Sequence, residues 1–151
     1  METIEKSAEV LNDLIQINND RVNGFEKVIA DLTDSDSDLK ALFLEYAGDS
    51  RKNSEELTAI VSRTSQTADT GTSISGSIHR AWIDVKAVFT GKDRKSLLDE
   101  CERGEDAIKK AYQSAMSEGE LSGETFSIVA AQAQTIKIAH DRIKALRDSA
   151  V

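Results

Sequence analysis

Apolar side chains recur with a spacing of three and four residues in four long segments of this chain. Because residues three and four apart lie on one face of an α-helix, the spacing predicts helices over about residues 4–32, 37–64, 94–117 and 123–148. In the first segment the repeating residues are Leu11, Ile15, Val22, Phe25, Ile29 and Leu32. Each helix would present one apolar stripe, wide enough to pack into a core that all four share.

Short polar turns separate the helices within two pairs. The stretch DLTDSDSDLK supplies turn and N-cap candidates before the second helix. In EGELSGET, Gly119 is suited to end the third helix and Ser122 to cap the fourth. Short links favour antiparallel neighbours, so the sequence predicts two helical hairpins.

A longer connection lies between the two hairpins. Residues 62–77, SRTSQTADTGTSISGS, lose the apolar period, and a short amphipathic helix is predicted over residues 76–89, with Trp82 on its apolar side. Gly91 is suited to end this helix, and Asp93 to cap the next one. Two hairpins joined by a long crossover are typical of ferritin-like bundles. We therefore expect residues 1–151 to form one all-α domain, a ferritin-like four-helix bundle.

A few polar side chains interrupt the apolar stripes. Asn18 falls on the stripe of the first helix, and Ser50 and either Asn53 or Ser54 fall on that of the second. The hairpin register places Asn18 level with about Asn53, which favours Asn53 over Ser54 for the inner position. Asn18, Ser50 and Asn53 are predicted to form a polar core layer, which fixes the alignment of helices. Glu105 and His140 fall on the stripes of the last two helices. A buried carboxylate needs a cation, a hydrogen-bond network or a proton, so Glu105 must have a partner.

Metal binding is the chemistry that these polar residues suggest. A dinuclear carboxylate bundle uses two Glu-x-x-His pairs, but the residues three before the two histidines are Gly76 and Lys137, so that motif is absent. A single weaker site of Glu26, Glu105 and His140 stays open, and iron, manganese or zinc would suit it. The alternatives are a buried acid paired with Lys, Arg or Asn, and a hydrogen-bonded core histidine.

Composition excludes several other functions. The net charge of −8 opposes binding to nucleic acid or to an anionic membrane. There is no phosphate-binding glycine motif, no nucleophile elbow, and no apolar run of about 20 residues that would span a bilayer. Cys101 lacks a metal-spaced second cysteine, so an inert buried thiol is expected, and His79 is expected at the surface. The acidic start METIEKSAEV does not resemble a secretion signal, so we expect a cytoplasmic protein.

Five stretches together carry a family resemblance. They are LNDLIQINNDRVNGFEK, LKALFLEYAGDSRK, SGSIHRAWIDVKAVFTGKD, ECERGEDAIKKAY and AHDRIKALRD, and they cover nearly the whole chain in order. The chain resembles a bacterial family of small ferritin-like four-helix-bundle proteins of unassigned function. The resemblance implies a ferritin-like fold and a bacterial cytoplasmic setting, and it implies no activity.

The sequence favours a non-enzymatic protein that acts in interaction or stress adaptation. Self-association is one form this would take, with Ile4, Leu44 and Val88 as candidate contacts. Trp82 is expected to anchor the connecting helix to the bundle or to contact a protein partner. The alternative is a metal-dependent oxidase or a metal-storage protein with a degenerate carboxylate and histidine site.

Overall fold

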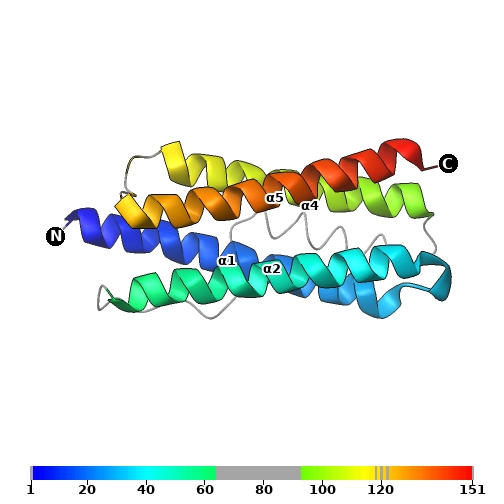
Figure 1. The fold of residues 1–151 in the computed structure, drawn as a ribbon, viewed down its shortest axis with the longest axis horizontal. Coiled ribbons are helices and arrows are strands. Elements are labelled where there is room, and N and C mark those ends of the chain that lie inside the picture. Colours follow the sequence, from blue (N-terminus) through cyan, green and yellow to red (C-terminus); the bar gives the residue numbers. More distant parts are fainter. Residues whose placement is uncertain (1, 64–92, 118, 120, 122, 151) are drawn as a thin grey trace.

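The protein is a bundle of long helices (Figure 1). The computed structural model describes residues 2–63, 93–117, 119, 121 and 123–150. Four long helices lie in this part of the chain: α1 (Glu2–Asp31), α2 (Ser37–Arg63), α4 (Arg94–Ser117) and α5 (Gly123–Ser149). No strand occurs in the described residues, so the prediction of an all-α helical bundle is confirmed.

The helices pair as two antiparallel hairpins (Figure 1). Between α1 and α2 the turn contains a short 3₁₀ helix, η1 (Asp34–Asp36), within the stretch where the sequence predicted turn residues. Between α4 and α5, Gly119 has a φ of 77°, a left-handed conformation that favours glycine at the end of a helix. At the start of α4, the backbone N–H of Ser96 donates to Oδ1 of Asp93 at 2.7 Å. Asp93 is therefore the N-cap that the sequence predicted.

The first residues of α2 and α4 lie at the same end of the bundle. Arg94 donates to Asp36 at 3.1 Å and to Asp38 at 2.6 Å. These contacts join the start of α4 to the start of α2. Helices α2 and α4 consequently run in the same direction, and the end of α2 lies far from the start of α4 (Figure 1). The short helix predicted over residues 76–89, including Trp82, lies outside the described residues.

The core is built from the predicted apolar stripes. The aromatic rings of Phe25 on α1 and Phe43 on α2 pack with centroids 5.0 Å apart. Tyr46 adds a third ring, 5.8 Å from that of Phe25. Phe126, in the first turn of α5, remains 38% exposed. Apolar side chains fill the space between the described helices, and a few polar side chains are buried among them.

Candidate functional site

An ion pair between α1 and α4 lies in the middle of the bundle. Nε of Arg21 donates to Oε1 of Glu105 at 2.7 Å, and Nη2 donates to Oε2 at 2.8 Å. Neither side chain has any exposed surface. The planar guanidinium fits a carboxylate at two points, so this pair has the geometry that best compensates for burying two charges.

The remaining faces of the Arg21 guanidinium are also in contact with protein groups. Nη1 donates to Oγ of Ser50 at 2.9 Å and to the backbone carbonyl of Tyr46 at 3.3 Å. The rings of Phe25 and Tyr46 lie 5.4 and 5.5 Å from the guanidinium carbon, within range of cation–π attraction. Burial by itself lowers the pKa of Arg21, but the charge and hydrogen bonds of Glu105 outweigh it and raise that pKa. Arg21 is therefore a permanent cation of the core.

The three residues predicted as a polar layer lie together beside Arg21. Ser50 donates from Oγ to Oδ1 of Asn18 at 2.9 Å, and Nδ2 of Asn53 donates to the same oxygen at 3.2 Å. Nδ2 of Asn18 donates to the backbone carbonyl of Leu14 at 2.8 Å. All three polar side chains are buried, so their hydrogen bonds offset the loss of water.

Tyr112 and Gln132 extend this network to the second hairpin. Nδ2 of Asn18 also donates to the hydroxyl of Tyr112 at 2.8 Å, and that hydroxyl donates to Oε1 of Gln132 on α5 at 2.7 Å. Burial raises the pKa of the Tyr112 phenol. The buried polar network therefore joins α1, α2, α4 and α5 through one connected chain of hydrogen bonds. We use this name for Asn18, Arg21, Ser50, Asn53, Glu105, Tyr112 and Gln132.

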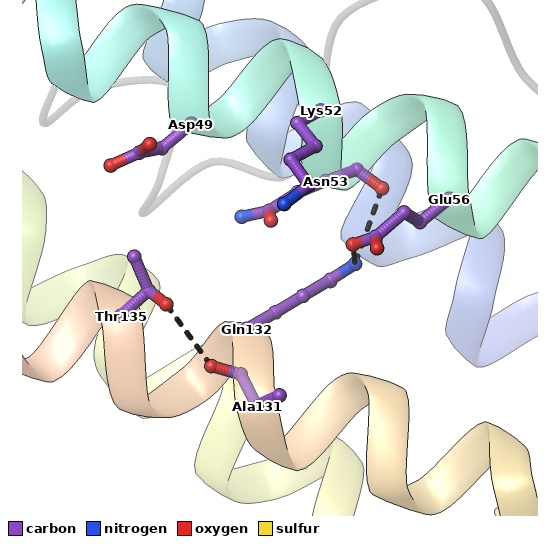
Figure 2. A pocket seen from close by; sticks show the side chains of 7 residues that line it. All are labelled: Asp49, Lys52, Asn53, Glu56, Ala131, Gln132 and Thr135. Carbon is purple, nitrogen blue, oxygen red and sulfur yellow. Dashed lines mark hydrogen bonds between the residues drawn. The ribbon is translucent and has the colours of Figure 1, made fainter.

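A small pocket lies at the α5 end of the network (Figure 2). It is an open pocket of about 150 Å³ between α2 and α5, and six of its seven lining residues have polar side chains. Nε2 of Gln132 donates to Oε1 of Glu56 at 3.0 Å, so the pocket floor is tied to the buried polar network. Partial burial raises the pKa of the Asp49 carboxyl, and the charge of Arg21 opposes this rise. The lining residues are Asp49, Lys52, Asn53, Glu56, Ala131, Gln132 and Thr135.

The candidate metal ligands Glu26, Glu105 and His140 have three different sets of partners. Glu26 is an exposed side chain that forms an ion pair with Arg51 of α2. Glu105 is buried with both oxygens bonded to Arg21. His140 contacts carboxylates of α4 and α5. The pairing of Glu105 with an arginine is one of the alternatives that the sequence left open.

Among the described residues, Glu102, Asp106 and His140 form the group that could bind a metal ion. Nε2 of His140 lies 2.9 Å from Oε1 of Glu102 and 3.7 Å from Oδ1 of Asp106. One atom of each residue lies within 4.8 Å of the other two. The side chains of Glu102 and Asp106 are 19% and 32% exposed, because both border the α4–α5 contact.

Arg21, Tyr112 and Gln132 are the members of the buried polar network that the sequence interpretation missed. Arg21 lies three residues after Asn18 and four before Phe25, so it shares their face of α1. The need of Glu105 for a buried cation, combined with this spacing, is the signal that could have identified Arg21. The hydroxyl group of Tyr112 carries the link to α5.

Cys101 is fully buried on α4 and does not take part in these polar contacts. Burial, with a further contribution from the charge of Glu105, raises the pKa of its thiol, and a thiol in this state is a poor nucleophile. The other two residues considered for contacts or chemistry, His79 and Trp82, lie outside the described residues.

These features define a class of protein: an all-helical bundle whose helices are joined by a buried polar network. The chain belongs to the family described as a domain of unknown function, DUF2383, whose model matches residues 6–118. No curated protein matches the chain significantly. Within the described residues, no helix is both long enough and apolar enough to cross a membrane.

Proposed function

We propose that this protein is a bacterial, cytoplasmic, ferritin-like bundle that works by interaction rather than by catalysis, in a setting such as stress adaptation. The observation that carries the proposal is the ion pair of Arg21 and Glu105, because a fixed guanidinium occupies the centre of the bundle. A cation at this position repels a metal ion, and both oxygens of Glu105 are already hydrogen-bonded. The interior is therefore organised for a fixed alignment of helices and not for a reaction.

Ferritin-like connectivity is part of this proposal. Its support is the contact of Arg94 with Asp36 and Asp38, which makes α2 and α4 run in the same direction. Residues 64–92 then have to connect opposite ends of the bundle, a distance of about 40 Å for a helix of 27 residues. We propose that this segment is a crossover with a short helix over residues 76–89, within a single domain of residues 1–151.

The interaction surface is proposed to include Leu44 and Trp82, and the partner to be a second copy of this chain or another protein. Leu44 supports this because it is a large apolar side chain on α2 with 54% of its surface exposed. Because about half of this side chain is already buried, covering the rest against a partner contributes about 1 kcal/mol to a complex.

A photo-crosslinking residue at position 44 tests the interaction. Ala59, which is exposed on the same helix, provides the matched control position. We expect a discrete product of higher mass from position 44 and not from position 59, and light scattering on Leu44→Lys to report whether that product is a dimer. Equal products from both positions, or none from position 44 in cells, would contradict the proposal.

Metal binding is the second candidate function, as an oxidase or a storage protein. The position of His140 among carboxylates favours it. The ligand set Glu26, Glu105 and His140 would require Glu105 to leave Arg21. Arg21 would then be a buried charge without its partner, which is energetically costly. Metal analysis of Glu26→Gln and wild type, both purified without chelator, tests this set, and a lower metal content in the variant would support it.

A further inference from the structure

We propose that Glu102, Asp106 and His140 form a binding site for a divalent transition-metal ion on the α4–α5 face. This inference deepens the metal-binding candidate with a different ligand set, and it does not depend on the interaction proposal. Glu102 and Asp106 are four residues apart, so they lie one turn apart on the same face of α4. His140 approaches them from α5, with only 6% of its side chain exposed.

The distances between the three residues are suitable for a metal ion. Ligands at the usual metal distance of about 2.1 Å lie roughly 3.4 Å apart around a tetrahedral ion. The distances of 2.9 and 3.7 Å from Nε2 of His140 to the two carboxylate oxygens lie on either side of that separation. Small rotations of these partly exposed carboxylates would bring all three atoms to an ion.

The second nitrogen of His140 gives an independent reason. Nδ1 lies 3.0 Å from Oδ1 of Asp141, and metal-binding histidines usually donate their other N–H to such a carboxylate. If Nδ1 carries the hydrogen, a neutral imidazole directs the lone pair of Nε2 toward Glu102 and Asp106. In that state the lone pair of Nε2 and the two carboxylates face one another and repel. A positive charge between them, such as a metal ion, removes this repulsion.

Neighbouring cations hold the outer oxygens of both carboxylates. Nη1 of Arg147 lies 3.4 Å from Oε2 of Glu102, and Nζ of Lys110 lies 3.0 Å from Oδ2 of Asp106. Each acid is thus held by one oxygen and turns the other oxygen toward His140. One imidazole and two carboxylates leave a fourth position for water, a donor set that suits Zn²⁺ or Mn²⁺ better than Mg²⁺.

Calorimetric titration of chelator-treated protein with Zn²⁺ tests the site. We expect one ion per chain for wild type, and affinity at least about tenfold weaker in His140→Gln and in Asp106→Asn. Glu55→Gln is the matched control, because Glu55 is an exposed acid on a different helix and outside both ligand sets, and its affinity should match that of wild type. Glu26→Gln distinguishes this site from the ligand set that includes Glu26. Circular dichroism establishes that each variant is folded.

Nitrogen chemical shifts of the histidine side chains give a readout that needs no destabilising variant. Zn²⁺ should shift the Nε2 resonance of His140, with His79→Gln used to assign the two histidines. Three results would overturn the proposal. They are absence of Zn²⁺ binding by wild type, a chemical-shift change at His79 alone, and equal Zn²⁺ affinity in wild type and His140→Gln. Loss of binding in Glu26→Gln but not in Asp106→Asn would reject this site and support the Glu26 ligand set instead.

Discussion

Arg21 of α1 and Glu105 of α4 form a two-point ion pair with no solvent contact. The pair joins the two hairpins across the core, 84 residues apart in sequence. Its partners on α2, Ser50 and the carbonyl of Tyr46, make it the point where three helices meet. The alignment of the bundle therefore depends on a charged contact and not on apolar packing alone.

Removal of one partner of this pair should be much more costly than removal of both. Arg21→Met leaves Glu105 as a buried charge without its cation, and we expect the free energy of unfolding to fall by about 3–5 kcal/mol. Arg21→Met combined with Glu105→Met should recover most of this loss, because no uncompensated charge remains. Urea denaturation followed by circular dichroism measures both values.

The exposed ion pair of Glu26 and Arg51 provides the control for this comparison. Both side chains are about half exposed, so Glu26→Gln should change stability by less than about 1 kcal/mol. Equal losses in Arg21→Met and the double variant would mean that the pair contributes through packing and not through charge.

Tyr112→Phe should weaken the link between the hairpins. The hydroxyl of Tyr112 accepts from Asn18 and donates to Gln132, so its removal leaves two buried amide groups each short of one hydrogen bond. We expect a loss of about 1–3 kcal/mol in thermal or urea unfolding. Tyr46→Phe is the matched control and should change stability little, because its hydroxyl makes no hydrogen bond to a described residue. Equal effects of the two variants would argue against the network.

The stability of the protein should decrease at alkaline pH. Burial, with a smaller effect from the charge of Glu105, raises the pKa of Tyr46 to about 12, and burial also raises the pKa of Tyr112. A phenol in the unfolded chain ionises near pH 10, at about its model value. Because the folded pKa is the higher one, this contribution to stability is complete below about pH 10 and is lost as pH rises toward about 12.

Urea midpoints measured from pH 8 to 12 test this expectation. The midpoint should be flat at first and should fall above about pH 10, and Tyr112→Phe should have a smaller slope than wild type. A midpoint that stays constant to pH 12 in wild type would contradict the burial of these phenols.

Cys101 should react with thiol reagents only when the protein unfolds. Its thiol is fully buried, and burial raises its pKa, so little thiolate is present at neutral pH. The rate of reaction with a disulfide reagent should therefore rise steeply with urea, in parallel with unfolding measured by circular dichroism. Rapid labelling of the native protein without urea would show that α4 opens locally around residue 101.

The sequence located several residues of the core from spacing alone. Asn18, Ser50 and Asn53 fell on predicted stripes, and in the structure they are buried and joined by hydrogen bonds. Glu105 also fell on a stripe and was expected to need a partner, which the structure identifies as Arg21. The partner was not predicted because helical period shows which residues face inward and does not show which residue of another hairpin lies opposite.

The surroundings of His140 illustrate the same limit. On α5, His140 contacts Glu102 and Asp106, which lie about one turn apart on α4. A difference of one turn in register decides which acids of α4 meet the imidazole. Side-chain direction along the helix, which spacing does not specify, completes the arrangement.

The sequence by itself determined the four long helices, the turns of the two hairpins and the inner face of each helix. These properties depend on local spacing, on caps such as Asp93 and on glycine at position 119, all of which act within a few residues. Only the tertiary structure decided that Arg21 meets Glu105 and that His140 meets Glu102, because contacts between hairpins depend on how two separately formed surfaces are aligned. The burial of charge makes that alignment specific, since any other register would leave a charged group in the core without its partner.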